Sequence, residues 1–412
     1  MTEKIKLIDL FAGCGGLSDG FEQTNLYETL ACVEWEKEPC KTLANRLKDK
    51  WSYENAFETV FHFDIQRTEE LINGWSNDPI YKSSEGLNSI VQKHNGIDVL
   101  VGGPPCQAYS VAGRIRDENG MNDDYRNFLF ESYLKVVTHF QPKAFIFENV
   151  PGLLSAKPGG VSIVERITEA FAEKGYEITN DLRANALIDC TKFGVPQARK
   201  RMVILGVNKN LIKESPQVAL HDFYKFIFPK YQAKKVSTVK DAINDLPKFL
   251  PLKEPIKTSK RKYSHAFDVC EIANHEPRMH SKRDIETFEL LTTDIESGQN
   301  KFTTVESLKD LYFEITGKRS NIHKYHVLKW NKPSNTIPAH LYKDGLRHIH
   351  PDPKQARTIT VREAARLQSF DDDFEFRGSL TDQYKMVGNA VPPKFAKAIA
   401  LALNDFLNKY YA

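Results

Sequence analysis

The feature that most constrains this chain is an alternation of short apolar runs with amphipathic stretches, which continues from residue 4 to about residue 207. Runs rich in β-branched residues, each followed by a segment with helical spacing, are typical of βαβ units that build a parallel sheet. We therefore predict an α/β fold with a mostly parallel sheet. The predicted strands are Ile5–Phe11, Leu30–Glu34, Val60–Asp64, Asp98–Gly102, Ala144–Glu148 and Met202–Val207.

Beyond residue 208 this alternation ends, and prolines interrupt an irregular, lysine-rich stretch. Pro392–Pro393 then introduces a helix predicted over Pro393–Tyr410, whose apolar residues recur at helical spacing and should pack back on the first sheet. We predict three segments: 1–207 for catalysis and cofactor binding, 208–379 as a smaller, irregular domain, and 380–412 as a return to the first domain.

Charge is unevenly distributed along the 412 residues. The net charge is +3, but residues 225–283 hold 14 Lys and Arg against six Asp and Glu, so this stretch carries +8 and the remainder −5. Such a segment is typical of a polyanion-binding surface, although a solvated lysine-rich surface is an equal alternative. Nine of the 12 histidines lie between His221 and His350 without metal-ligand spacing, so we expect core or solvent histidines and no metal site.

Composition also indicates the compartment. The six cysteines form no C-x-x-C pair, which argues against a disulfide scaffold or a cysteine-rich zinc site. No apolar run approaches the roughly 18 residues that span a bilayer. The N-terminal residues lack the charged, apolar and small-residue regions of an export signal. We therefore expect a cytoplasmic protein without a membrane segment.

The first predicted strand leads into the glycine-rich turn Ala12-Gly13-Cys14-Gly15-Gly16 and then into a helix. Ligands of open α/β sheets bind at such turns. Ser18 occupies the third glycine position of the dinucleotide fingerprint, so a pyrophosphate cofactor is disfavoured, while close approach of another ligand to the backbone remains open. A purely structural tight turn is the alternative.

Residues at the next two strand ends suit an adenosine. Glu34 ends the second predicted strand, where a carboxylate can accept hydrogen bonds from both ribose hydroxyls, and Trp35 can stack on a purine. Asp64 ends the third strand and can accept from an adenine amino group, or can cap the strand end. A cofactor that carries adenosine without a pyrophosphate suggests S-adenosylmethionine.

A cysteine follows the fourth strand in Gly102-Gly103-Pro104-Pro105-Cys106. The glycines permit close approach of a substrate and the prolines fix the direction of the backbone, so Cys106 is presented at the carboxyl edge of the sheet. A thiolate is a strong nucleophile at neutral pH. The alternative is a buried structural cysteine, but two Gly and two Pro make burial in a regular element improbable.

Two further strands bring polar groups toward the same edge. Glu148 emerges from an apolar strand, and desolvation would favour its acid form as a proton donor; a helix cap is the alternative. Gln197, Arg199 and Arg201 precede or begin the last strand, and in an extended segment they would share one face. Three donors on one face suit a phosphate or a base edge.

Together these motifs resemble the C5-cytosine DNA methyltransferase family, and the resemblance covers nearly the whole chain. It rests on the segments Asp9–Phe21, Glu34-Trp35, Asp64, Pro104-Pro105-Cys106-Gln107, Glu148-Asn149-Val150, Gln197-x-Arg199-x-Arg201, Arg362–Gln368 and Gly388-Asn389-Ala390-Val391-Pro392-Pro393. The resemblance implies a Rossmann-like methyltransferase fold that binds S-adenosylmethionine. The cofactor pocket would be lined by Phe11, Gly13, Cys14, Gly16, Glu34, Trp35, Asp64, Ile65, Pro104, Leu129 and Asn389.

The resemblance also implies a mechanism. Cys106 would attack C6 of cytosine while Glu148 donates to N3, so that C5 takes the methyl group. Arg201 would hold the cytosine carbonyl, and Arg199 would support Glu148 or the backbone. A base in a duplex must be flipped out for this chemistry, and the loop Tyr109–Tyr125 would close over the DNA.

Segment 208–379 would then be the target-recognition domain, with duplex DNA as the substrate. Further substrate contacts are expected from Gln107, Ser110, Gln197, His340 and Lys343. The compact layout suggests a monomeric bacterial restriction-modification enzyme at the nucleoid, with a cognate endonuclease as a partner. Two alternatives stay open: methylation of transfer RNA by the same family, and a DNA-binding homologue without activity, which should have lost Cys106 or Glu148.

Overall fold

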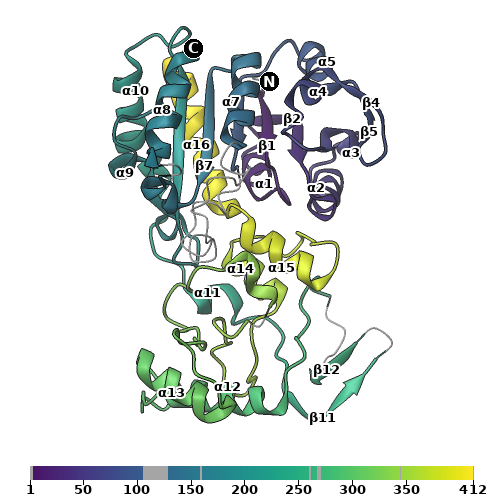
Figure 1. Cartoon of the computed structure of the whole chain (residues 1–412), viewed down its shortest axis with the longest axis vertical. Coiled ribbons are helices and arrows are strands. Elements are labelled where there is room, and N and C mark those ends of the chain that lie inside the picture. The colour runs from purple at the N-terminus through teal and green to yellow at the C-terminus, as the bar shows by residue number, and fades with distance from the viewer. Residues whose placement is uncertain are drawn as a thin grey trace. The chain divides into compact units, whose positions relative to one another are not determined.

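The computed structural model describes the chain except residues 1–2, 105–128, 158–159, 259–260, 267–270, 344 and 412. The chain divides into two compact units (Figure 1). Unit 1 comprises Met1–Gly194, Arg199–Lys235 and Ala390–Ala412, and unit 2 comprises Val195–Ala198 and Val236–Asn389. Unit 1 is therefore built from the beginning, the middle and the end of the chain.

Unit 1 is organised around an eight-stranded sheet in the order β3-β2-β1-β6-β7-β10-β8, with β9 paired to β10. In this sheet β3, β2, β1, β6 and β7 run parallel to one another, and β10 is antiparallel to β7, β8 and β9. The predicted mostly parallel α/β fold is thus confirmed. The bounds are β1 Ile5–Leu10, β2 Tyr27–Glu34, β3 Val60–His62, β6 Val99–Gly102, β7 Ala144–Asn149, β8 Tyr176–Glu177, β9 Leu187–Asp189 and β10 Lys200–Asn208.

All six predicted strands are present, and their ends differ by a few residues. β1 stops at Leu10 because Phe11 adopts a left-handed φ of 59°, which turns the chain out of the sheet. β6 and β7 are buried along their whole length, as expected for parallel strands covered on both faces. Their carboxyl ends therefore present the following residues at one edge of the sheet.

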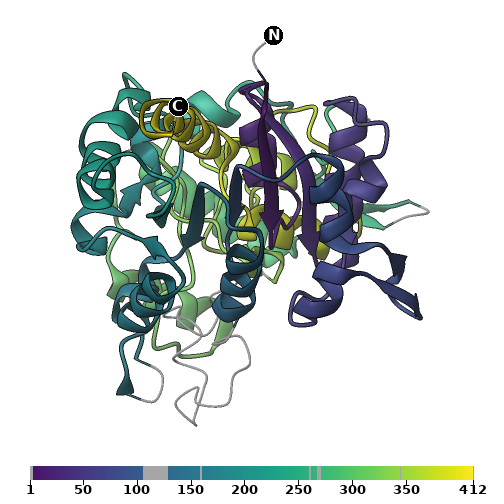
Figure 2. The ribbon, with the colours of Figure 1, turned by 90° about the horizontal axis from the view of Figure 1, so that it is seen from above.

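Helices cover both faces of this sheet, with α7 and α16 on opposite sides (Figure 2). Tyr133 of α7 is fully buried, and its hydroxyl donates to the carbonyl oxygens of Leu100 and Ile146 at 3.3 and 3.0 Å. The helices of unit 1 are α1 Gly16–Glu22, α2 Lys37–Asp49, α3 Ala56–Thr59, α4 Thr68–Asn73, α5 Gly86–Lys93, α7 Leu129–Phe140, α8 Ile163–Glu173, α9 Leu182–Asn185, α10 Pro216–Asp222 and α16 Pro393–Tyr410. Shorter turns are Pro151–Ser155, Cys190–Phe193, Phe223–Ile227 and Phe228–Tyr231, and a small hairpin joins β4 Trp75–Asp78 to β5 Lys82–Ser84.

The C-terminal helix α16 has the predicted bounds and packs in unit 1. Its apolar residues are fully buried, namely Phe395, Ile399, Leu403 and Phe406. Gly20 of α1 lies against it so closely that a Cβ there would be 2.4 Å from the Cβ of Ala396. The last segment therefore completes the fold that the first segment begins.

Residues 208–235 also belong to unit 1, whereas the sequence analysis placed the change of domain near 208. The Tyr224 hydroxyl donates to the Val203 carbonyl and accepts from the Leu205 amide, both at 2.9 Å. Residues 380–389 belong to unit 2, so its last boundary follows Asn389. Residues 208–235 pack on β10 and α16, and this packing explains why the first boundary lies later than predicted. Composition does not reveal such packing. The functional division of the chain stays a prediction.

Unit 2 is smaller and less regular. Its helices are α11 Val239–Ile243, α12 Lys282–Glu296, α13 Val305–Thr316, α14 Val361–Leu367 and α15 Leu380–Asn389, with a short turn at Ala339–Tyr342 and a hairpin of β11 Pro251–Lys257 and β12 Lys262–His265. The predicted helix after residue 361 is present as α14, and Thr360 and Glu363 form its capping box. Arg362 of α14 is fully buried and donates to three backbone oxygens.

A buried ion pair joins α14 to the segment before it. Arg357 donates to both carboxylate oxygens of Glu363, at 2.7 and 2.6 Å, and both side chains are almost fully buried. Burial alone would raise the pKa of Glu363, but the charge of Arg357 and its hydrogen bonds hold that pKa well below the usual range. His350 Nε2 lies 3.5 Å from the same carboxylate. Burial lowers the pKa of His350 to about 3, so it stays neutral.

Three further histidines of unit 2 resemble His350. His265, His280 and His348 are buried, and burial lowers their pKa values to about 4, 3 and 3. They are core histidines, as the sequence analysis expected. Among the residues that the structure describes, no group of three or more His, Cys, Asp or Glu could hold a metal ion. Within the same residues, no helix has the length and apolar character that crossing a bilayer requires.

Substitution of Arg357 by alanine should strongly destabilise unit 2. It leaves the Glu363 carboxylate buried without its partner, a change that typically costs about 3–5 kcal/mol. Arg377→Ala is the matched control, because Arg377 pairs with Glu375 at 2.7 Å on the surface and such pairs contribute about 0–1 kcal/mol. The free energies of unfolding would be compared by urea denaturation of the whole chain. Equal, small losses in both variants would contradict a supporting role for the buried pair.

Candidate functional site

The glycine-rich turn after β1 is held to the end of β2 by a carboxylate. Glu34 Oε2 accepts from the Gly13 amide at 2.9 Å, and Oε1 accepts from the Glu36 amide at 2.8 Å. Gly13 and Gly15 have positive φ values of 56° and 92°, which favour glycine. Apart from the adjacent residues, no atom of the described part of the chain lies within 4 Å of the position that a Cβ of Gly13 would occupy, so this position leaves space for a ligand.

Glu34 is buried, and burial raises its pKa to about 7 despite the two backbone donors. Trp35, the next residue, has 54% of its surface exposed. The pair therefore presents a desolvated carboxyl group beside an exposed aromatic ring. The sequence analysis assigned these two residues to the ribose and purine of an adenosine, and that role stays a prediction.

The turn after β3 contributes Asp64 and Ile65. Asp64 is partly exposed, and its Oδ1 accepts from the Gln66 amide at 3.0 Å, which is the strand-end cap considered above. Asp64 Oδ2 has no hydrogen bond to a described residue, so capping and ligand binding are compatible. Ile65 is buried, and its carbonyl accepts from the Thr68 hydroxyl at 2.8 Å. The turn is thereby fixed to the start of α4.

The other predicted pocket residues lie on several elements of the chain. Cys14 is buried, and burial raises the pKa of its thiol to about 12, so it is no nucleophile. Gly16 begins α1, and Leu129 begins α7 and is buried. Phe11 is partly exposed at the end of β1. Asn389 ends α15 in unit 2 and is exposed.

The carboxyl ends of β6 and β7 bring Gly103 and Glu148 into close contact. A Cβ on Gly103 would lie 2.8 Å from Glu148 Oε2, so this position has no room for a larger residue unless the carboxyl moves. One residue further along each segment, Asn149 Nδ2 donates to the Pro104 carbonyl at 3.4 Å. The backbone that leads toward Cys106 is therefore tied to the strand that carries Glu148. Cys106, Gln107, Ser110 and the whole loop Tyr109–Tyr125 lie outside the described residues.

Glu148 is buried and faces two arginines of its own unit. Arg201 Nε lies 2.9 Å from Glu148 Oε1. Burial raises the pKa of Glu148 above its usual value, while the positive charges of Arg201 and Arg199 act in the opposite direction. Burial and the two arginine charges therefore set the proton affinity of Glu148 in opposite directions. A carboxyl group that donates a proton needs such a balance, so that it holds the proton before the reaction and can release it during the reaction.

The structure assigns Arg199 and Arg201 to unit 1, where the charges of both act on Glu148, and Gln197 to unit 2. β10 begins only at Lys200, and Gln197 belongs to unit 2, where its amide bonds to the Gln368 side chain and the Ile337 backbone. Arg199 is buried and donates to the Ala390 carbonyl at 3.0 Å. The family resemblance implied that Arg199 supports either Glu148 or the backbone, and that role stays a prediction.

The expected DNA contacts of unit 2 are exposed. His340 and Lys343 both lie on the surface at or next to the short turn Ala339–Tyr342. Sequence reasoning gave no role to Asp9, whose Oδ1 is buried without a hydrogen bond and whose Oδ2 accepts from Ser18. It also gave none to Asn149. The only available signal for Asn149 was its position directly after Glu148.

Comparisons with known proteins agree with this geometry. The model of the family described as C-5 cytosine-specific DNA methylase matches residues 5–405. The chain is 34% identical to the type II methyltransferase M.Bpa9945I of Bacillus paralicheniformis, with 98% of this chain and 100% of the relative covered. It is 32% identical to the type II methyltransferase M1.HphI of Haemophilus parahaemolyticus, over 96% and 86%. A prophage-encoded E. coli structure described as a DNA modification methyltransferase shares the fold, with a TM-score of 0.63, 24% identity and coverage of 98% and 100%.

Replacement of Arg201 by glutamine should raise the pKa of Glu148 further. An opposite charge within about 4–6 Å lowers the pKa of a carboxylic acid by about 1–3 units, and this variant removes it. The pKa would be measured by ¹³C NMR titration of the carboxyl signal, assigned by its loss in Glu148→Gln. Lys200→Gln, at an exposed neighbouring position, serves as the control and should leave the titration unchanged. A fall in the Arg201→Gln variant would contradict the proposed electrostatics.

Proposed function

Because the chain belongs to the C-5 cytosine-specific DNA methylase family, we propose that it methylates C5 of a cytosine flipped out of a specific duplex DNA sequence. The observation that carries this proposal is the contact between the Glu148 carboxyl and Gly103, three residues before Cys106. This contact supports the proposal that the Cys106 thiol and the Glu148 carboxyl act on the same base. Relatives named as type II methyltransferases support a role in a restriction-modification system.

S-adenosylmethionine, when bound, supplies the electrophilic methyl group. The residues of unit 1 fit its adenosine. The Glu34 carboxyl would accept from the ribose hydroxyls, Trp35 would stack on the adenine, and the free oxygen of Asp64 would accept from the adenine amino group. The open space beside Gly13 would admit the cofactor close to the backbone. No pyrophosphate site is needed for such a ligand.

The proposed chemistry begins with the Cys106 thiolate. Its sulfur forms a bond to C6 of cytosine while Glu148 donates a proton or a hydrogen bond at N3, so the electron pair of the C5–C6 double bond becomes available at C5. C5 then takes the methyl group. Loss of the C5 proton to a base re-forms the double bond, and the bond between C6 and sulfur breaks. Arg201, beside Glu148, would hold the cytosine carbonyl.

This chemistry requires attack on a ring face that is covered in a duplex. Flipping the base out costs a few kcal/mol, which contacts elsewhere on the DNA must offset. We propose that the loop Tyr109–Tyr125 closes over the flipped base and that unit 2 recognises the target, with His340 and Lys343 among its contacts. Part of the basic stretch 225–283 lies in unit 1, because Lys225, Lys230 and two further lysines belong to that unit.

The proposal includes the setting of the enzyme. We infer that it acts as a monomer in the bacterial cytoplasm at the nucleoid, and that a cognate endonuclease cuts the same site when it is unmethylated. Labelled S-adenosylmethionine offered with duplex DNA or with transfer RNA distinguishes the two substrates. Incorporation into RNA alone would contradict the DNA assignment. Bisulfite sequencing of DNA from expressing cells would then identify the methylated cytosine.

Cys106→Ala should abolish methyl transfer and the covalent adduct with duplex DNA that contains 5-fluorocytosine. The variant lacks the nucleophile, and 5-fluorocytosine traps the adduct because fluorine at C5 cannot leave as a proton does. Cys32→Ala is the control, since burial raises the pKa of the Cys32 thiol well above its usual value and keeps it unreactive. Denaturing gel electrophoresis detects the adduct. An adduct in the Cys106 variant would refute the mechanism.

Trp35→Ala should weaken binding of S-adenosylmethionine by about tenfold without lowering the melting temperature. Stacking of an aromatic ring on a base typically contributes about 1–3 kcal/mol, and the Trp35 ring contributes little to the core because it is exposed. Phe57→Ala is the matched control, as Phe57 is an aromatic residue of the same unit with 58% exposure. Isothermal titration calorimetry gives the affinity. An equal effect of both substitutions would argue against stacking at Trp35.

A further inference from the structure

The β11–β12 hairpin projects from the remainder of unit 2 (Figure 1). Six of the seven residues of β11 are exposed. A two-stranded hairpin by itself is marginally stable in water, so this one depends on contacts at its base. The Ala266 amide donates to the Leu250 carbonyl at 2.8 Å, and the His265 ring lies 2.8 Å from the Gln355 carbonyl oxygen.

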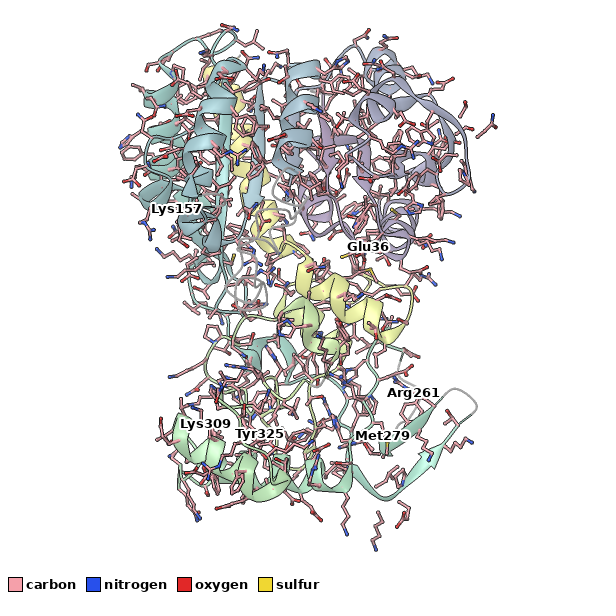
Figure 3. The ribbon with its side chains drawn as sticks, in the orientation of Figure 1. Glu36, Lys157, Arg261, Met279, Lys309 and Tyr325 are labelled. Carbon is pink, nitrogen blue, oxygen red and sulfur yellow. The ribbon has the colours of Figure 1, made fainter. Side chains whose placement is uncertain are left out.

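One face of the hairpin is attached to unit 2 through β12. Tyr263 is buried, and its hydroxyl donates to Glu276 at 3.2 Å. Arg261, labelled in Figure 3, pairs with the same carboxylate and lies 4.8 Å from the centre of the Tyr263 ring. The charge of Arg261 is thereby compensated within unit 2. The opposite strand β11 has no comparable attachment among the described residues.

Two lysines face each other across the outer end of the hairpin. Lys257 and Lys262 are direct partners in the register of β11 and β12, and both are exposed. Like charges directly opposite each other destabilise a strand pair. Neither lysine forms an ion pair within the part of the chain that the structure describes, and the same holds for the exposed Lys253. Among the described residues, the two ammonium groups therefore repel each other without an ion-pair partner, and a bound anion would relieve this repulsion.

We propose that the β11–β12 hairpin is a DNA-binding arm whose Lys257 and Lys262 flank one phosphate of the duplex. The inference rests on the proposed function and extends it to named residues. A phosphate between the two ammonium groups replaces their repulsion by two attractions. Lysine contacts to phosphates position a protein on DNA without reading the sequence, so the arm contributes affinity and not specificity.

The test is the salt dependence of DNA binding. Each phosphate contact contributes about 0.9 to the slope of log affinity against log salt concentration, so Lys257→Gln with Lys262→Gln, which removes the contact to one phosphate, should lower the slope by about 0.9. The advantage of the wild type in affinity should then shrink about 3.5-fold between about 50 and 200 mM KCl. Fluorescence anisotropy with a fluorescein-labelled duplex of mixed sequence measures both proteins. An unchanged slope would overturn the proposal.

A matched variant separates the position of the charges from their number. Lys301→Gln with Lys318→Gln removes two exposed lysines of the same unit outside the hairpin and should leave the slope unchanged. An equal decrease in this variant would mean that net charge alone acts, and would overturn the proposal. A decrease in the salt slope that is seen with transfer RNA but not with the duplex would also overturn the proposal.

Stability and binding should change in opposite directions in Lys257→Glu. This substitution places opposite charges across the hairpin, so the melting temperature should stay the same or rise, while affinity for the duplex and the salt slope fall. Loss of both stability and affinity would instead indicate a structural lysine.

If the wild type methylates DNA but the slopes of all variants agree, only the hairpin inference fails. If the wild type neither methylates nor binds DNA, the proposed function fails as well.

Discussion

The arrangement of the catalytic edge depends on one steric constraint, the absence of a side chain at residue 103. β6 and β7 are adjacent parallel strands, and their ends come close enough that the Glu148 carboxyl occupies the space where a Cβ of Gly103 would be. This contact, with the Asn149 amide on the Pro104 carbonyl, fixes the start of the segment that carries Cys106 relative to the acid. Arg201 then keeps the acid in place from β10.

Burial and charge act against each other throughout this site. Desolvation raises the pKa values of both Glu34 and Glu148, but the two groups have different partners. Glu34 is held by backbone amides, which orient it without adding a full charge. Glu148 faces guanidinium groups, which favour its ionised form. One acid is therefore suited to accept hydrogen bonds from a neutral ligand, and the other to exchange a proton with a base.

Much of unit 1 was predictable because its signals are local. Apolar runs gave six strands with small errors at their ends, and residues at strand ends gave Glu34, Asp64 and Glu148 at one edge of a sheet. The bounds of the compact units differ from the predicted segments where packing between distant segments decides the structure. Residues 208–235 join unit 1 through Tyr224 and its contacts with β10, and Gln197 turns into unit 2. Neither contact leaves a periodic pattern in the sequence.

The short segment Val195–Ala198 has a consequence for how such enzymes can acquire new targets. It belongs to unit 2, although it precedes β10 of unit 1, and it is joined to Ser334 by two backbone hydrogen bonds of 3.0 and 2.7 Å. A recombination event that replaces the continuous stretch 236–389 would leave this segment behind. Any transplanted stretch must therefore offer the resident segment a matching backbone, which restricts the donors from which the proposed recognition module can be inherited.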